Sequence, residues 1–568
     1  MKRIVSLILA LMMGLGLMAF PAMAEDTLDV TSLYKAKDVD DSWSEDANVI
    51  TLQDTTASAS GSGAVIEGNT VTISQEGEYV LTGTLQGQIV IETADTEKVH
   101  LILNGVTIEG TSGPAIYEKC SDKLIVTLAE GTVNTLTDST SIQDGEDTIA
   151  AALYAEDDLS INGKGTLVIQ GNAGNGIHSK ADLVIADGDI QVTAANDGIK
   201  GRNSVLVLSG SITIHSEGDG LVSTRDDKEG KGYVVIAGGS LSITTGSGAG
   251  EVVQTASSRM GRGGWGMQTQ TASTADTPSI KGIKAATTLT VCGGTLDINA
   301  EDDALHAVNV TVSGGSLTIR TGDDGIHGDT AVSILDGVID ILQCNEGVEG
   351  ENVAISGGVT SIVCADDGVN ATTADSSNSW NREASDGSLM TISGGELYIT
   401  AGSDGLDSNG NIVITGGVIG VYAATTMGEG TVDYNGSSTM SGGTLILATN
   451  GNLGGNLISG TALMSVQASG QAGSEISLTD AAGNLLGSFT PGSSYSTVIV
   501  GSSSLASGDS CAVTVAGQTV YSGALTGTTY TAGDGFGGQF GGMGGQFGGG
   551  FGGQPGGGRG GRGGRGGW

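Results

Sequence analysis

Acidic residues stand before glycine repeatedly in the central part of this 568-residue chain. Each belongs to a short segment of acid, glycine and aliphatic residue, as in Asp197-Gly198-Ile199. In some copies the acid is doubled, and in others a second acid follows the aliphatic residue. The candidate metal ligands are Asp197, Asp219, Asp302, Asp303, Asp323, Asp324, Glu346, Glu349, Asp366, Asp367, Asp404 and Asp407. Because Ca²⁺ prefers oxygen ligands, the pattern predicts a ladder of calcium-binding acids.

Two interpretations of these acids stay open. With one acid per structural repeat, neighbouring carboxylates would lie about 5 Å apart and repel each other. A calcium ion takes roughly six to eight oxygens and neutralises such a ladder by bridging adjacent repeats. Asp-Gly is also ordinary turn chemistry, and an exposed carboxylate can stay solvated. For single acids we favour the turn, whereas the doubled acids exceed what a turn needs and favour calcium.

A second set of residues is suited to contact a sugar polymer. Insertions at roughly 225–232, 251–279 and 372–387 leave the repeat beside the acids and carry tryptophan and arginine. Aromatic faces stack on pyranose rings, and arginine pairs with uronate carboxylates. The candidate substrate-binding residues are Trp265, Trp380, Arg382, Lys200, His306 and His327. The alternatives are that the insertions are mobile solvent loops and that the two histidines, in matching positions of neighbouring repeats, only stack; calcium does not prefer imidazole.

The acids belong to a repeat of short strands. Two apolar-x-apolar strands follow each acidic segment, as in Val205-Leu206-Val207 and Ile212-Thr213-Ile214. The first strand begins at Leu183, Val205, Val234, Leu289, Val310, Val332, Val353, Met390 and Ile412. A base period of about 22 residues with insertions is typical of a solenoid whose stacked coils share one core. The constant offset between the two strands disfavours a β-sandwich of hairpins, so we predict an all-β parallel β-helix.

Composition and charge agree with this architecture. The chain has 99 glycines and only 4% aromatic residues, so its core must consist of small aliphatic side chains. Its net charge of −40 argues against binding nucleic acid or anionic membranes. The five cysteines are odd in number and lack zinc-site spacing. Cys344 and Cys364 lie nearly one coil apart, and we interpret them as isolated buried thiols.

The chain divides into segments of different character. Residues 1–24 have the basic head, apolar body and small-x-small site of a signal peptide, which predicts secretion, and no later segment reads as a membrane span. The further segments are a polar stretch at 25–60, an irregular β cap at 61–170, the regular coils at 171–453, a small β region at 454–532 and a disordered tail at 533–568. The tail is rich in Gly, Gln, Phe and Arg and cannot fold alone.

Several of these motifs also occur in a known family. Gly77-Glu78-Tyr79-Val80-Leu81-Thr82-Gly83 and Asp323-Asp324-Gly325-Ile326-His327 are among them. On these motifs the chain, over about residues 40–530, resembles the secreted carbohydrate-binding-domain β-helix family of clostridia. The resemblance implies a right-handed parallel β-helix similar to pectate lyases, with bound calcium, binding of cellulose and acidic sugars, and no established catalysis. The glycine-rich tail is not part of that pattern.

The sequence therefore predicts a secreted, monomeric, non-catalytic protein that binds polygalacturonate or a cellulose-like polysaccharide with Ca²⁺. Cell-wall contact through the tail is a further hypothesis. One alternative is a calcium-dependent polysaccharide lyase, for which Arg225, Arg382 or Lys200 would be the base. A hydrolase using Asp302-Asp303 and a structural surface adhesin are the others. No residue is assigned a catalytic role.

Overall fold

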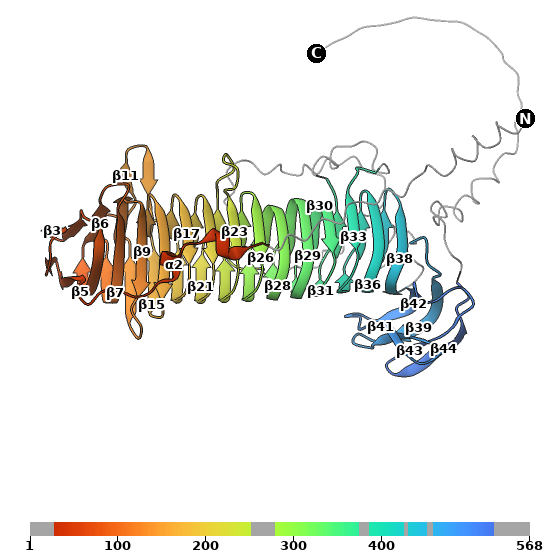
Figure 1. The fold of residues 1–568 in the computed structure, drawn as a ribbon. Coiled ribbons are helices and arrows are strands. Elements are labelled where there is room, and N and C mark those ends of the chain that lie inside the picture. The colour runs from red at the N-terminus through yellow and green to blue at the C-terminus, as the bar shows by residue number, and fades with distance from the viewer. Residues whose placement is uncertain (1–27, 251–278, 374–384, 425–429, 451–457, 528–568) are drawn as a thin grey trace, which may run out of the picture.

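The computed structural model describes residues 28–250, 279–373, 385–424, 430–450 and 458–527 (Figure 1). Within these ranges the protein is all-β, and its helices are η1 (Val30–Leu33) and α2 (Ala36–Val39). No helix in this part of the chain is long and apolar enough to cross a membrane. The strands form an elongated stack with a smaller β unit at its C-terminal end. The signal peptide and the tail that the sequence predicts lie outside the described residues.

Each coil of the stack contributes three strands. One coil consists of β17 (Asp182–Ile185), β18 (Asp189–Ala194) and β19 (Ile199–Gly201). These strands pair in parallel with β20 (Ser204–Val207), β21 (Ser211–Ser216) and β22 (Leu221–Ser223) of the next coil. Parallel pairing of each strand with the third strand after it excludes a sandwich of hairpins, in which consecutive strands would pair antiparallel. The predicted all-β, parallel architecture is therefore confirmed.

Three parallel ladders run along the stack. The first contains β9 (Lys123–Leu128), β14 (Asp158–Gly163), β17, β20, β23 (Tyr233–Ile236), β26 (Thr288–Val291) and β33 (Leu389–Ile392). The second contains β10 (Val133–Thr137), β15 (Thr166–Gly171), β18, β21, β24 (Ser240–Thr245), β27 (Thr295–Ala300), β31 (Val359–Val363) and β34 (Glu396–Ala401). The third contains β6 (Gln88–Glu92), β8 (Ile116–Cys120), β13 (Ala151–Ala155), β16 (Asn175–Ser179), β19, β22, β25 (Ile283–Ala285), β32 (Val369–Ala371), β35 (Leu406–Ser408) and β37 (Val432–Tyr434).

Some strands are long enough to pass from one ladder to another. These strands are β28 (Leu305–Thr321), β29 (Ile326–Gln343), β30 (Val348–Ile355), β36 (Asn411–Ala423) and β38 (Ser438–Thr449). The nine residues at which the sequence pattern starts the first strand form one continuous register column through them, from Leu183↔Val205 to Met390↔Ile412. The residues that the sequence pattern aligns are therefore register partners in the parallel strands.

Aliphatic side chains fill the interior because alternate residues of each strand point inward. Ile199, Leu221, Ile283, Leu305 and Ile326 are consecutive inward residues of the third ladder, and each has no exposed surface. Burial of one such side chain contributes on the order of 2 kcal/mol. At the corner between the first two ladders, Gly294 has φ +90°, and a Cβ there would meet the carbonyl oxygen of Gly239 at 2.9 Å. The stacked Gly-Gly turns are therefore required by both conformation and space.

Antiparallel strands close both ends of the stack. At the N-terminal end, β1 (Asn48–Asp54) pairs with β2 (Thr56–Ala59), and β3 (Ala64–Glu67) pairs with β4 (Thr70–Ile73). The first coils then follow in β5 (Gly77–Gln86) and β7 (Lys98–Glu109), and a hairpin arm of β11 (Ile142–Asp144) and β12 (Asp147–Ile149) projects from the stack. The C-terminal unit consists of β39 (Met464–Gly470), β40 (Ile476–Asp480), β41 (Leu485–Phe489), β42 (Tyr495–Ser502), β43 (Ser510–Val515) and β44 (Gln518–Ala524). Its apolar core also includes Tyr422, Ile446 and Ala448 of β36 and β38, and β42 pairs antiparallel with β38.

Candidate metal- and ligand-binding face

The acids that precede glycine lie at the start of the third ladder and form an acid column. Its members are Asn175, Asp197, Asp219, Lys281, Asp303, Asp324, Glu346, Asp367 and Asp404, each two residues before an inward aliphatic residue. All of its aspartates are at most 7% exposed except Asp367, which is half-buried. Asp303 Oδ1 accepts the backbone N–H of Asp324 at 3.2 Å, and Asp367 Oδ1 accepts that of Asp404 at 2.8 Å. Several column side chains thus carry a backbone hydrogen bond between coils.

This structural role was not predicted from the sequence. Asn175 Oδ1 accepts the backbone N–H of Asp197 at 3.1 Å, so an amide serves there as well as a carboxylate. Asp197 Oδ1 in turn accepts the N–H of Asp219 at 3.2 Å. One oxygen of Asp197 is thus used in the hydrogen bond between coils, and its other oxygen accepts from Lys200 Nζ at 2.8 Å. The signal that could have revealed this role is the asparagine at the first position of the column.

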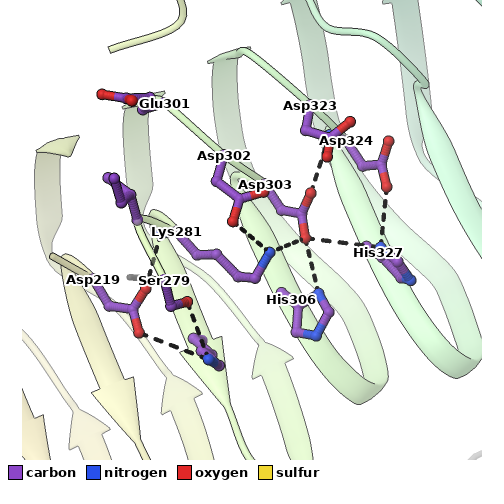
Figure 2. Close-up of polar contacts among 12 residues, drawn as sticks. Asp219, Ser279, Lys281, Glu301, Asp302, Asp303, His306, Asp323, Asp324 and His327 are labelled. Atoms are coloured by element: carbon purple, nitrogen blue, oxygen red, sulfur yellow. Dashed lines mark hydrogen bonds and ion pairs between the residues drawn. The ribbon is translucent and has the colours of Figure 1, made fainter. Parts of the chain in front are cut away.

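Lys281 is the cationic member of the column, in the segment Lys281-Gly282-Ile283. Its ammonium nitrogen lies 2.9 Å from Asp302 Oδ2 and 2.6 Å from Asp303 Oδ2 (Figure 2). The calcium ladder predicted from the sequence took Asp302 and Asp303 as ligands without this lysine. Burial disfavours the charge of Asp303, but the hydrogen bond from His306 and the Lys281 charge outweigh it and lower the pKa of that carboxyl below its usual range.

An outer row of side chains lies three residues after the column. Its members are Tyr154, His178, Lys200, Val222, Lys284, His306, His327, Glu349, Asn370, Asp407 and Asp433, consecutive partners in the parallel register. The substrate-binding candidates Lys200, His306 and His327 are therefore brought into one line. All of its lysines and histidines come before Glu349, and all of its acids come from Glu349 onward. The charged side chains of the row therefore change from basic to acidic between His327 and Glu349.

In its basic part, the outer row neutralises the acid column. Lys200 Nζ lies 2.8 Å from Asp197 Oδ2, and Lys284 Nζ lies 4.0 Å from Asp219 Oδ2. His327 Nδ1 lies 3.0 Å from Asp324 Oδ2. Burial lowers the pKa of His327, but the hydrogen bond to Asp324 and the surrounding carboxylates outweigh it and raise that pKa to about 9. The carboxylates of Asp197, Asp219 and Asp324 are therefore already paired with cationic side chains of the protein.

The later coils form an acidic end with a different charge balance. We define the acidic end as Glu346, Glu349, Asp366, Asp367, Asn370, Asp404 and Asp407. Among the described residues, no lysine, arginine or histidine forms an ion pair with Glu346, Glu349, Asp366 or Asp367. Burial, followed by the charge of Glu349, raises the pKa of Glu346 to about 9. Burial and the charge of Asp366 raise the pKa of Asp367 to about 7. Glu346, Glu349, Asp366 and Asp367 therefore bring four carboxyl groups onto neighbouring coils without an ion pair to a cation of the described residues.

Asn370 supplies a test of whether a metal ion fits the acidic end. Its amide nitrogen donates to Glu346 Oε2 at 2.9 Å. Its amide oxygen is buried and has no hydrogen-bond partner within the described residues. A buried oxygen left unpaired costs about 1–3 kcal/mol, so a ligand at this point would relieve a penalty. Because amide and carboxylate oxygens are calcium ligands, the donor set fits Ca²⁺.

The remaining candidates are placed differently. Trp265, Trp380 and Arg382 lie outside the described residues, so the sugar-binding role of their insertions stays a prediction. In the described insertion, Arg225 Nε donates to Asp227 Oδ1 at 2.9 Å and its guanidinium also contacts Asn203.

A polar cavity of about 420 Å³ lies beside the hairpin arm. It is lined by Tyr117, Lys119, Asp144, Asp147, Glu156 and Asp157. Periodicity could not reveal this cavity, because its lining residues come from β8, from the hairpin arm and from the residues after β13, and the hairpin arm does not follow the spacing of the other strands.

Fold and face together define a class: an all-β protein of parallel strands with one strongly polar side. A family model described as "Carbohydrate-binding domain-containing protein" matches residues 67–325 and 323–481, which is more than half of the chain. The chain therefore belongs to this family.

Individual relatives match over shorter stretches. A protein of Acetivibrio thermocellus with the same description is 37% identical over 128 residues, or 22% of this chain and 45% of that protein. The match thus spans less than half of the relative's length. A solved structure, "Structure of the polysaccharide lyase-like protein from C. thermocellum, Gadolinium derivative", aligns at 26% identity over 48% of this chain and 93% of that chain, with a TM-score of 0.38.

Proposed function

We propose that the protein is a secreted, non-catalytic carbohydrate-binding protein that uses calcium at its acidic end to bind acidic or cellulosic polysaccharide. One observation carries the proposal: the buried amide oxygen of Asn370 has no hydrogen-bond partner within the described residues, and its amide nitrogen contacts the half-buried carboxylate of Glu346. Membership in the carbohydrate-binding family supports the class of ligand. We also propose that the stack is a right-handed parallel β-helix.

Calcium would be held by Glu346 and Asn370, with Asp366, Asp367 and Asp407 beside them. An ion bound there would supply a positive charge that bridges the protein carboxylates to the carboxylate of a uronate unit. Oxygen atoms of the acidic end that are partly exposed, such as those of Glu349 and Asp366, orient the ligand. A neutral cellulosic chain would instead use hydroxyl groups as the oxygen ligands.

The basic part of the outer row continues the binding line. Lys284, His306 and His327 present one polar group per coil, at a step of about 4.8 Å that is on the order of one pyranose unit, and Lys200 lies two coils before Lys284. A polysaccharide lying along the row would meet calcium at one end and protein cations at the other. The tryptophans at 265 and 380 are proposed to stack on sugar rings from the insertions, and the tail is proposed to contact the cell wall.

The lyase alternative needs a base that can lose its proton. Lys200 is held by the Asp197 carboxylate at 2.8 Å, and Arg225 by Asp227 at 2.9 Å. Each side chain is thus already engaged by a carboxylate and is not presented as a free base. This observation favours binding over catalysis.

Titration of the purified protein with polygalacturonate, with and without calcium, tests the proposal while absorbance reports unsaturated product. We expect calcium-dependent binding without product. Asn370→Leu should weaken binding about 10-fold or more, whereas the control Asn352→Ala, on the first ladder away from the acidic end, should leave it unchanged. Product formation would establish a lyase instead, and calcium-independent binding would refute the calcium role.

A double variant tests the insertions. Trp265→Ala combined with Trp380→Ala should weaken binding if the two rings stack on sugar. Unchanged binding would show that the polysaccharide uses the coils alone, as would be expected of an adhesin with another contact face.

A further inference from the structure

The point at which the outer row changes sign brings together a donor set unlike the rest of the face. Asp324, His327 and Glu349 each offer one ligand atom, and these atoms lie within 4.8 Å of one another. Glu349 is the direct register partner of His327 on the neighbouring strand, and Asp324 is three residues before His327 on the same coil. Asp324 is buried, while His327 and Glu349 are half-buried. The set is thus built by the stack and open on one side.

The chemistry of these three groups selects a class of ion. Calcium and magnesium take oxygen ligands almost exclusively, whereas imidazole suits zinc and the other first-row transition metals. One imidazole and two carboxylates are also a donor set that zinc accepts in proteins. Glu346 and Asn370 on the later coils offer only oxygen, so the two parts of the face differ in the ion that they prefer.

A neighbouring set competes for the same histidine. Asp303, His306 and His327 also offer ligand atoms within 4.8 Å. However, Asp303 Oδ2 already lies 2.6 Å from the Lys281 ammonium and 2.9 Å from His306 Nδ1. A metal ion at Asp303 would lie against this ammonium and be repelled by it. No lysine or arginine of the described residues forms an ion pair with Asp324 or Glu349, and the cation next to Asp324 is His327 itself, whose proton a bound metal ion would displace. The ion is therefore expected on this side.

The adjacent histidine stabilises the arrangement without being a ligand. The rings of His306 and His327 meet edge to face with their centroids 4.8 Å apart. His306 Nδ1 is hydrogen-bonded to Asp303 Oδ2 at 2.9 Å, so the ring that packs against His327 is itself held in one orientation. A ligand whose orientation is fixed before the ion arrives loses less entropy on binding.

We propose that Asp324, His327 and Glu349 form a binding site for a divalent transition-metal ion such as Zn²⁺, separate from the all-oxygen calcium site. A water molecule or a hydroxyl group of a bound sugar would complete the coordination of the ion. The protein thereby carries two ion sites of different selectivity on one face.

Calorimetric titration of the full mature chain, prepared without a polyhistidine tag, tests this site. Zn²⁺ is added in the presence of excess Ca²⁺, so that the all-oxygen site is saturated. The wild type should bind about one Zn²⁺, and His327→Ala should weaken that binding about 100-fold or more. Glu349→Gln, which keeps the shape of the side chain, should weaken it about 10-fold or more.

Two controls make the result specific. His178→Ala removes a histidine of the same row that is remote from the site, and it should change zinc affinity less than about 3-fold. Co²⁺ in place of Zn²⁺ should give a visible absorption band in the wild type that His327→Ala abolishes. Circular dichroism verifies the fold of each variant, and Glu349→Gln carries the test if His327→Ala does not fold.

Absence of zinc binding by the wild type, or unchanged affinity in a folded His327→Ala or Glu349→Gln variant, would overturn the site. This outcome is distinct from failure of the proposed carbohydrate function, which is read from calcium-dependent polygalacturonate binding by the wild type alone.

Discussion

Replacing Lys281 with methionine tests whether this lysine is the built-in counterion of the acid column. The side chain is only 14% exposed and pairs with Asp303, which is 3% exposed, at 2.6 Å. Removing one partner of a buried ion pair leaves an uncompensated charge and costs about 3–5 kcal/mol. The second pair, to the 33% exposed Asp302, adds little because water screens it. We therefore expect the free energy of unfolding to fall by about 3 kcal/mol.

The same substitution should create a calcium site. Asp302, Asp303 and Asp323 offer oxygen atoms within 4.8 Å of one another, and Lys281 is the cation that now lies among them. Calcium should therefore recover much of the stability that Lys281→Met loses. Urea denaturation in chelator and in excess Ca²⁺ measures both effects.

Lys98→Met is the matched control, because Lys98 pairs with Asp122 at 2.8 Å while half exposed. Exposed pairs contribute about 0.2–1 kcal/mol, so this variant should lose little stability and gain nothing from calcium. A Lys281→Met protein as stable in chelator as the Lys98→Met protein would refute the counterion role.

Three further predictions concern other groups. Asp219→Asn keeps the oxygen that accepts the Lys281 N–H at 2.8 Å and should preserve stability, whereas Asp219→Ala should cost about 1–3 kcal/mol in urea denaturation. Burial raises the pKa of Glu118 from 4.5 to about 7, so the contribution of Glu118 to stability is complete below pH 4.5 and is lost as pH rises through 7. Relative to Glu118→Gln, the free energy of unfolding of the wild type should therefore fall by about 3 kcal/mol between pH 4.5 and pH 7. Thermal and urea unfolding at both pH values measure this difference. Calcium at about 100 times its dissociation constant should stabilise the wild type by about 2.7 kcal/mol, and Asn370→Leu should remove most of that gain in differential scanning calorimetry. An equal calcium gain in both proteins would contradict the assignment.

Much of the fold could be predicted because the chain repeats. An inward aliphatic residue at a constant spacing determines which residues stack, and the register column from Leu183 to Ile412 is the direct result. The antiparallel closures at the two ends have no period, so periodicity could not reveal them.

The candidate face could be predicted only in part. The sequence identified the acids and the alignment of His306 with His327, because both follow from the repeat. It could not reveal that the column acids turn one oxygen inward, since that depends on backbone geometry at a corner. Nor did it reveal Lys281, whose effect arises because an insertion returns the chain to the column with a lysine instead of an acid. Side-chain direction and charge compensation are three-dimensional properties that spacing alone does not contain.

The antiparallel closures determine how long the polar face can be. Within the described residues, antiparallel strands occupy the edges of β1 and β4 at one end and of Thr444–Thr449 at the other, so copies cannot add coil upon coil along these edges. From Tyr154 to Asp433 the outer row extends about 50 Å at one strand spacing per coil. A long polysaccharide would project beyond both ends of this row and offer further places for other copies. Under the proposed function, one polysaccharide chain would therefore bind many copies of the protein side by side. The number of bound copies, and with it the negative charge and the stiffness of the complex, would increase with the length of the polysaccharide.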